Sequence, residues 1–264
     1  MKKITVNDIL KKKKKSKITV LTCYDYSFAK ILDSTGLDIV LVGDSLANVV
    51  LGMKETRKIS IKEMLNHTKA VSLGIKQALI VADMPYKSYQ KDPKKCLYYA
   101  DKFINAGADA VKIEWFKKCP YVAKKLIKNN IPVMGHIGLT PQTVHLLGGY
   151  KVQGKDKNSS SNLLKQAKIL ENLGVFSLVL ECIPWQLGRL ITKGISKPTI
   201  GIGAGKYCDG QVLVLYDLIG LYQDKSPKFV KIYKNLSSDV KSAVSNFIRD
   251  VKKNRFPTQK QSFS

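Results

Sequence analysis

The sequence has few acidic residues and very little arginine. It holds 45 Lys and Arg against 20 Asp and Glu, a formal net charge of +25. Arginine stands only at Arg57, Arg189, Arg249 and Arg255, so 41 of the 45 basic residues are lysine. Specific nucleic-acid recognition favours the planar guanidinium fork of arginine. The lysine excess, together with many Ile, Asn and Tyr, is more typical of AT-rich coding. A basic nucleic-acid-binding protein is the less favoured alternative.

Cysteine pairs and long hydrophobic runs are also missing. The five cysteines are odd in number and form no CxxC pattern, which argues against a disulfide framework or a thiolate zinc site and fits a reducing compartment. No window approaches the roughly 20 apolar residues that a membrane span needs. The basic N-terminal segment, with Asp8 and Lys11–Lys15, holds no apolar stretch typical of a secretory signal. We therefore expect a cytoplasmic protein that does not bind membranes.

Eight short apolar runs, rich in β-branched residues, are the main structural signal. Continuous apolar runs are typical of strands that are buried on both faces, as in parallel sheets. Hydrophobic residues make up 44% of the chain, which is enough for a substantial core. The runs are Ile18–Tyr24, Asp38–Gly43, Ala78–Ala82, Ala110–Ile113, Ile131–Gly135, Ser177–Leu180, Thr199–Ile202 and Val212–Leu215.

Amphipathic segments with helical spacing alternate with these runs. They are Ile59–Leu73, Pro93–Ala106, Tyr121–Asn130, Ser161–Leu173 and Ser238–Lys252. Strand–helix alternation predicts an α/β fold, and an open doubly wound sheet is the alternative. Eight units in 264 residues without a second domain favour a (β/α)₈ TIM barrel, which typically needs about 250 residues.

We expect one domain over residues 1–264, with a short basic N-terminal segment and a mobile tail at 254–264. Two long connections, Ser45–Lys58 and Leu139–Ser160, interrupt the alternation. Connections of this length in a compact domain are usually functional or disordered.

A carboxylate follows four of the predicted strands. These residues are Asp44, Asp83, Glu114 and Glu181. The carboxyl ends of barrel strands meet at the face that carries the active site, so the four acids should converge there. Carboxylates packed together need a cation or protons, and the oxygen ligands Asp44, Asp83 and Glu114 suit Mg²⁺. The alternative is that each acid caps the following helix.

Further candidates lie at the same predicted face. Lys112 precedes Glu114 by two residues and should point to the same side of its strand. His136, at the end of the fifth run, is predicted to face a substrate. His67 and His145 are interpreted as structural, and GIGAG at 201–205 as close backbone packing, because it lacks the full GxGxxG form.

Several motifs together carry a resemblance to a known family. TCYDYSFA (22–29), LVGDSL (41–46), VKIE (111–114), GHIGLTPQ (135–142), GGYKVQG (148–154), LVLE (178–181) and GIGAG…DGQ (201–211) occur in order along nearly the whole chain. In these motifs the sequence resembles the 3-methyl-2-oxobutanoate hydroxymethyltransferases, also called ketopantoate hydroxymethyltransferases.

The resemblance implies a barrel of the phosphoenolpyruvate/pyruvate type, usually a homodecamer. It also implies transfer of a hydroxymethyl group from 5,10-methylenetetrahydrofolate to 3-methyl-2-oxobutanoate, forming 2-dehydropantoate for pantothenate and coenzyme A. It makes Asp44, Asp83 and Glu114 the metal site, Ser45, Asp83 and Lys112 substrate contacts, and Glu181 the proton acceptor. The implied partners are small molecules, with no specific nucleic acid.

The sequence departs from the family pattern in three loops. Ala47 replaces a usual glycine, Met53–Glu55 replaces a stretch that usually contains histidine, and Trp115-Phe116 stands where glycines are frequent. These departures alter loops on the folate side more than the set of acids. A Mg²⁺-dependent carbon–carbon lyase of 2-oxo acids on the same barrel is the alternative function, and dependence on folate would separate the two.

Overall fold

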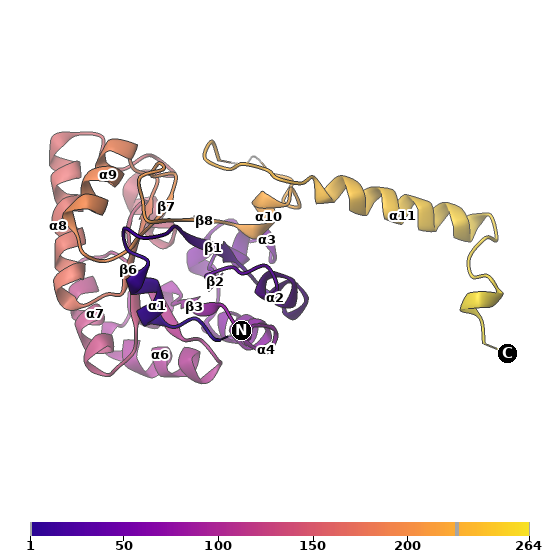
Figure 1. Cartoon of the computed structure of the whole chain (residues 1–264), viewed down its shortest axis with the longest axis horizontal. Coiled ribbons are helices and arrows are strands. Elements are labelled where there is room, and N and C mark those ends of the chain that lie inside the picture. The colour runs from indigo at the N-terminus through magenta and orange to yellow at the C-terminus, as the bar shows by residue number, and fades with distance from the viewer. Residues whose placement is uncertain (1, 225–226, 264) are drawn as a thin grey trace. The chain divides into compact units, whose positions relative to one another are not determined.

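In the computed structural model, which describes residues 2–224 and 227–263, eight parallel strands close into a barrel in chain order, β1 to β8. The predicted TIM barrel is confirmed (Figure 1). The strands are β1 Ile18–Thr22, β2 Ile39–Val42, β3 Leu79–Asp83, β4 Ala110–Glu114, β5 Val133–Gly138, β6 Ser177–Glu181, β7 Thr199–Ile202 and β8 Gly210–Leu213.

Each predicted run contains or overlaps one observed strand, and only the ends differ. The observed strand β5 lies two to three residues further toward the C-terminus than the predicted run Ile131–Gly135, because it begins after Pro132. Proline has no N–H to donate to a strand ladder. The last run begins earlier than predicted, because Gly210 already pairs with Ile18 of β1 and with Ile200 of β7. A Cβ at Gly210 would lie 2.4 Å from the Ile18 carbonyl oxygen, so this approach of backbones requires glycine.

Helices surround the strands of the barrel (Figure 1). Those predicted from spacing are α4 Ile61–Gly74, α6 Cys96–Asn105, α7 Cys119–Lys128 and α8 Lys157–Leu173. Helix α8 begins earlier than predicted, because the Asp156 carboxylate caps it by accepting hydrogen bonds from the N–H groups of Asn158 and Ser159. The 3₁₀ turns and short helices between strands are η1 Thr56–Lys58, η2 Pro93–Lys95, η3 Pro141–Leu147, α3 Leu46–Val49 and α5 Tyr86–Tyr89.

Besides the short helices α3 and α5, three helices within residues 2–214 were not predicted. They are α1 Val6–Lys11, α2 Tyr26–Asp33 and α9 Trp185–Gly194. Helix α9 contains Gly188, a poor helix former, but a Cβ at that position would lie 2.4 Å from the Ala204 carbonyl oxygen. Packing against the loop after β7 therefore selects glycine there against local helix propensity.

The core fills the barrel and continues toward its N-terminal segment. Ile9 of α1 is fully buried and belongs to the same apolar cluster as Ile18, Ile39 and Phe176. The basic segment predicted at the N-terminus is thus partly a structural helix. Its Lys13 side chain bonds Asp209 at 2.7 Å, and the Lys13 side chain is 9% exposed.

Residues 1–214 and 215–264 form two compact units. The second contains α10 Leu215–Leu218, α11 Leu236–Lys252 and η4 Gln259–Gln261. Helix α11 confirms the predicted segment 238–252 within two residues. The expectations of a single domain and of a mobile tail at 254–264 stay predictions, and residue 264 lies outside the described residues.

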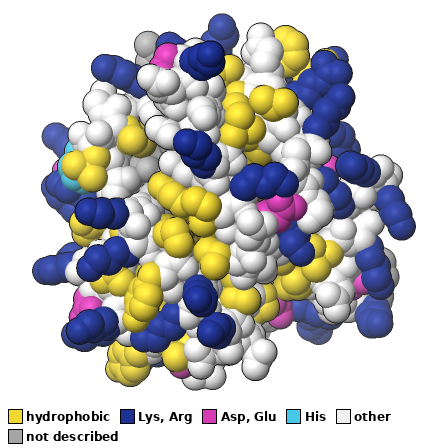
Figure 2. All heavy atoms as spheres, turned by 90° about the vertical axis from the view of Figure 1, so that its left-hand side faces the viewer, with side chains coloured by type: hydrophobic (Ala, Val, Ile, Leu, Met, Phe, Trp, Pro, Cys, Tyr) yellow, Lys and Arg dark blue, Asp and Glu magenta, His cyan; other side chains and the backbone are white. Residues whose placement is uncertain are grey.

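The surface is rich in lysine, and the cysteines are unpaired. On the face that Figure 2 shows, Lys and Arg side chains are spread among neutral and hydrophobic ones rather than gathered in one patch. All five cysteines are free thiols. Among the residues that the structure describes, no helix is both long enough and apolar enough to cross a membrane.

Candidate active site

The barrel brings the predicted acids to its carboxyl-end mouth. Asp83, Glu114 and Glu181 are the last residues of β3, β4 and β6, and Asp44 follows β2 after one glycine. The strand register sets their neighbours: Asp83 lies opposite Lys112, and Glu114 opposite His136. Residues distant in sequence therefore become neighbours through backbone pairing alone.

Asp44, Asp83 and Lys112 form one buried charged group. The Lys112 ammonium lies 2.9 Å from Asp83 Oδ1, and the Asp44 backbone N–H donates to Asp83 Oδ2 at 2.9 Å. Burial raises the pKa of Asp83 to about 7, against the opposing effect of Lys112. Burial lowers the pKa of Lys112, but the charges of Asp83, Asp44 and Glu114 outweigh it, and the pKa lies above its ordinary value. Lys112 is therefore a permanent cation at this mouth.

Glu114 is held by groups from two other segments. Its backbone N–H donates to the Tyr89 hydroxyl at 2.9 Å, and its Oε2 accepts from the Gln142 N–H at 3.1 Å. Burial, followed by the charge of Asp44, raises the pKa of Glu114 well above its ordinary value. The Gln142 carboxamide donates to Asp44 Oδ2 at 3.0 Å, so Gln142 links two of the acids.

His136 stands between Lys112 and Glu181. Its Nδ1 lies 3.3 Å from Lys112 Nζ, and its Nε2 lies 3.2 Å from Glu181 Oε2. Burial and then the charge of Lys112 lower the pKa of His136 well below its ordinary value, so the ring is neutral. An ammonium can only donate, which assigns the ring proton to Nε2, facing Glu181. The Nε2–H group lies close to the Glu181 carboxylate, but the two are not aligned as a hydrogen bond among the described residues.

Glu181 combines burial with access. Burial raises its pKa from 4.5 to about 7, with Lys112 acting in the opposite direction. Its side chain is 15% exposed, against 3% for Asp83 and 1% for Glu114. A carboxylate with a pKa near neutrality that a small molecule can reach has the properties of a general base.

The remaining candidates lie as follows. Ser45 bonds the Tyr24 hydroxyl through its Oγ at 2.8 Å, beside Asp44. His67 Nδ1 lies 2.6 Å from the Tyr24 carbonyl oxygen, in keeping with a structural role. His145 lies near Arg57, on a different loop from the acids. In GIGAG, a Cβ at Gly205 would lie 2.4 Å from Trp185, which agrees with close packing.

The carboxylates of Asp44, Asp83 and Glu114 are the candidate ligands of a divalent metal ion. Within residues 2–224 and 227–263, no three His, Cys, Asp or Glu side chains converge closely enough to hold a metal as they stand. One buried oxygen at this mouth, Glu114 Oε1, nevertheless has no hydrogen-bond partner among these residues, whereas the Lys112 ammonium compensates Asp83 Oδ1. Uncompensated buried carboxylate oxygens are costly. In donor type the site fits a hard cation, but side-chain rotation is needed to bring the acids onto one.

Two residues of the site were missed by sequence reasoning. Tyr89 donates its hydroxyl proton to Gln142 Oε1 at 3.1 Å and belongs to α5, which no sequence pattern predicted. Gln142 stands at the end of the GHIGLTPQ motif, and this position was the only feature of the sequence that pointed to Gln142 as a site residue. Both come from connections whose course is set by tertiary packing.

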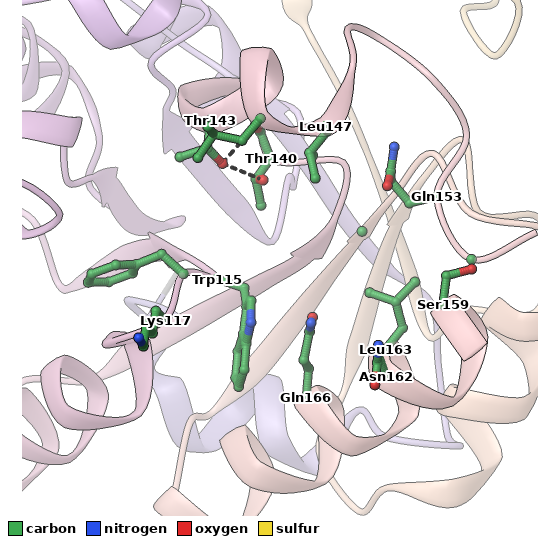
Figure 3. Close-up of a pocket in the computed structure, with 14 residues that line it drawn as sticks. Trp115, Lys117, Thr140, Thr143, Leu147, Gln153, Ser159, Asn162, Leu163 and Gln166 are labelled. Carbon is green, nitrogen blue, oxygen red and sulfur yellow. Dashed lines mark hydrogen bonds between the residues drawn. The ribbon is translucent and has the colours of Figure 1, made fainter.

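A cavity of about 340 Å³ lies among the connections that follow β4 and β5 and helix α8. Trp115 and Lys117 border it from the loop after β4, Thr140 and Thr143 from the segment after β5, and Gln166 from α8 (Figure 3). Trp115 directly follows Glu114, so the cavity wall continues from the strand that carries this acid.

Comparison with known proteins identifies close relatives of this chain. A family model described as ketopantoate hydroxymethyltransferase matches residues 3–259. A 3-methyl-2-oxobutanoate hydroxymethyltransferase of Clostridium botulinum strain Langeland is 51% identical over 253 residues, covering 96% of this chain and 92% of the relative. A protein of the same name from Caldicellulosiruptor saccharolyticus is 47% identical over 264 residues, covering 100% of both chains.

Solved structures with a similar fold are much more distant in sequence. A 2,3-dimethylmalate lyase, described as a member of the PEP mutase/isocitrate lyase superfamily, aligns with a TM-score of 0.61 at 12% identity, covering 98% of this chain and 91% of that one. A phosphonopyruvate hydrolase in complex with oxalate and Mg²⁺ aligns with a TM-score of 0.63 at 11% identity, covering 99% and 92%. These likenesses establish the barrel type alone.

Proposed function

This chain belongs to the ketopantoate hydroxymethyltransferase family, and on that premise we propose that it transfers a hydroxymethyl group from 5,10-methylenetetrahydrofolate to 3-methyl-2-oxobutanoate. The product is 2-dehydropantoate, for pantothenate and coenzyme A synthesis. The observation that carries the proposal is the mouth of the barrel, where one accessible carboxylate with a pKa of about 7 faces a group of buried acids and a lysine.

In this proposal, Asp44, Asp83 and Glu114 hold a Mg²⁺ ion. The buried Glu114 Oε1, which has no hydrogen-bond partner among the described residues, supports this assignment, as does the preference of Mg²⁺ for carboxylate ligands. When bound, the ion supplies positive charge where the substrate's oxo oxygen becomes negative. Ser45 and Lys112 contact the substrate, and Lys112 contributes a permanent charge for its carboxylate or oxo group.

Glu181 removes the C3 proton of 3-methyl-2-oxobutanoate. The C3–H bond is a weak acid, and the electron pair that it leaves is delocalised onto the oxo oxygen as an enolate. The raised pKa of Glu181 improves its match to this proton. His136 is proposed as a positioning residue: its Nε2 lies 3.2 Å from the Glu181 carboxylate, and a small rotation of either side chain would join the two by a hydrogen bond.

The enolate carbon then forms a new carbon–carbon bond to the one-carbon unit of the folate. The two carbon–nitrogen bonds of that unit break, and water supplies its hydroxyl group. Tetrahydrofolate leaves with one proton from the water and the one that Glu181 took from C3. The relatives' shared name, at 47% and 51% identity, favours this reaction over a lyase, since the lyase likeness rests on 12% identity.

The test is an assay of the purified protein with 3-methyl-2-oxobutanoate, methylenetetrahydrofolate and Mg²⁺. The expected result is 2-dehydropantoate that forms only when all three are present. Folate-independent cleavage of a 2-oxo acid would favour the lyase instead. Because the acids are needed for this reaction, Asp83→Asn serves as the inactive control.

We further propose a cytoplasmic homo-oligomer, of which a decamer is the form that the family resemblance implies. Val240, Val244, Phe247 and Val251 recur at three- or four-residue spacing on α11 and are exposed. These side chains form an apolar stripe along one side of α11. Burial of this stripe in an assembly would remove it from water. Light scattering on the full chain measures the mass, and a monomer at micromolar concentration would exclude this assembly.

A further inference from the structure

The cavity among the connections after β4 and β5 and helix α8 has two chemically different sides. Trp115, Phe116 and Leu163 give it aromatic and aliphatic surface, while Gln166 and Asn162 present carboxamides from α8 (Figure 3). Of the described residues that line it, none is acidic. Its volume of about 340 Å³ lies within the range of about 300–1,000 Å³ that is usual for small-molecule sites.

The carboxamides of Gln166 and Asn162 are available to a ligand. Neither side chain hydrogen-bonds another group within residues 2–224 and 227–263. A carboxamide both donates and accepts, so the pair can meet a ring edge on which donors and acceptors alternate. Trp115 offers an indole face, and indole faces stack on flat heterocycles.

The cavity is joined to the catalytic strands through backbone. The Trp115 N–H donates to the His136 carbonyl oxygen at 2.8 Å, and the Leu139 N–H donates to the Glu181 carbonyl oxygen at 2.9 Å. Gly138, which borders the cavity, pairs with Glu181 between β5 and β6. A ligand in the cavity would therefore contact Gly138 of β5, whose neighbour on β6 is Glu181.

Lys117 adds a charge at the outer part of the same wall. It is exposed and follows Trp115 by two residues. An anionic tail on a ligand whose ring lies against Trp115 would meet this ammonium. The cavity thus offers three features together: a flat aromatic surface, neutral edge groups and an outer cation.

We propose that this cavity binds the pterin ring of the folate co-substrate, with Trp115 stacked on the ring, Gln166 and Asn162 at its edge, and Lys117 near the carboxylate tail. The inference rests on the proposed function, because it gives the co-substrate of that reaction its place. It assigns a binding role to Trp115, one of the residues in which this chain departs from the family pattern.

Fluorescence tests the inference without turnover. The chain has two tryptophans, Trp115 and Trp185, and Trp185 lies outside the cavity, against the ring of Tyr207. The Trp185→Phe variant leaves Trp115 as the single tryptophan. Tetrahydrofolate, added with 3-methyl-2-oxobutanoate and Mg²⁺, should quench its emission to saturation, after correction with free N-acetyltryptophanamide. Emission that stays constant up to millimolar tetrahydrofolate would overturn the proposal.

Kinetics supply the second measurement. Trp115→Ala should raise the KM for methylenetetrahydrofolate between about 5-fold and 150-fold, as expected for loss of one stacked ring. Trp115→Phe should restore most of this loss, and Gln166→Leu should raise the same KM without removing the stack. Trp185→Ala is the matched control and should leave it unchanged. If the KM for folate does not change in Trp115→Ala and Gln166→Leu, the cavity is not the pterin site.

Exchange of the C3 hydrogen with deuterium separates this inference from the proposed function. The exchange needs no folate, so Trp115→Ala should exchange as the unmodified protein does while its folate KM rises. A protein that binds tetrahydrofolate at Trp115 but never exchanges C3 would contradict the proposed function and support the cavity. If the C3 hydrogen exchanges but tetrahydrofolate does not quench Trp115 emission, the result would support the proposed function and contradict the cavity assignment.

Discussion

Replacing Glu181 by glutamine tests the centre of the proposed mechanism. Glutamine keeps the shape of the side chain but cannot accept the C3 proton. The variant should retain Mg²⁺ and 3-methyl-2-oxobutanoate, because Glu181 is assigned to neither ligand set. The loss should be confined to the transition state. General-base catalysis typically contributes about 10²–10⁴-fold, so exchange of C3 hydrogen for deuterium should fall by that factor.

The pH dependence makes the prediction specific to this residue. With a pKa of about 7, the ionised fraction of Glu181 rises from about 0.1 at pH 6 to about 0.9 at pH 8, so exchange should rise about tenfold. A glutamate with the ordinary pKa of 4.5 would be ionised throughout this range and give a flat profile. His136 stays neutral over the same range, because its pKa is lowered.

Asp83 needs a control, since its pKa is also raised to about 7. Exchange should therefore be followed by NMR at saturating Mg²⁺, because a metal ligand is held deprotonated. Under these conditions the rise with pH belongs to Glu181 and should vanish in Glu181→Gln. Exchange at the wild-type rate in the variant, or a persistent tenfold rise, would refute the assignment of the base.

The other predictions concern the metal, the fold and the charge. Asp44→Ala and Asp83→Ala should each abolish turnover and weaken Mg²⁺ binding, which calorimetry measures. The circular dichroism spectrum should stay native, because the barrel remains folded. Near-native activity in either variant would contradict the metal site. Gly138 has φ +97°, and a Cβ there would lie 2.2 Å from the Glu181 carbonyl oxygen, so Gly138→Ala should destabilise the protein by more than about 1 kcal/mol in urea unfolding. In the metal-free protein, the raised pKa of Glu181 means that protonation stabilises the fold below about pH 4.5, and this contribution is lost as pH rises through about 7. From pH 5 to pH 8, the free energy of unfolding of Glu181→Gln should therefore rise relative to that of the wild type, by on the order of 1–3 kcal/mol. If the difference between the two proteins stays constant over this range, the pKa of Glu181 is ordinary. Nucleic-acid binding should be weak, independent of sequence and lost at moderate salt; a tight complex with one sequence in a filter-binding assay at physiological salt would contradict this.

The parts of the fold that follow from local patterns were predictable. Continuous apolar runs mark strands buried on both faces, and each of the eight runs corresponds to a strand of the barrel. Helices with a clear apolar face, such as α4 and α8, were also found. Helices α2 and α9 were not, although their apolar residues also lie along one side. They have only 8 and 10 residues, against 14 and 17 in α4 and α8, so their pattern repeats over fewer turns.

The position of the acids was predictable for a topological reason. All strands of a parallel barrel run the same way, so a carboxylate at the end of an apolar run must lie at one face. Asp44, Asp83, Glu114 and Glu181 do so. The metal and catalytic roles of these residues stay predictions that the experiments above address.

Only the tertiary structure decided which groups touch. The register between strands pairs Asp83 with Lys112 and Glu114 with His136, and Tyr89 and Gln142 reach the acids from irregular connections. Burial then sets the protonation of Glu181 and His136. By itself the sequence determined where the strands lie along the chain, because each strand is a local apolar run. It also determined which side chain stands at the end of each strand. Contacts and pKa values depend on the distances that chain closure creates, and no local pattern encodes those.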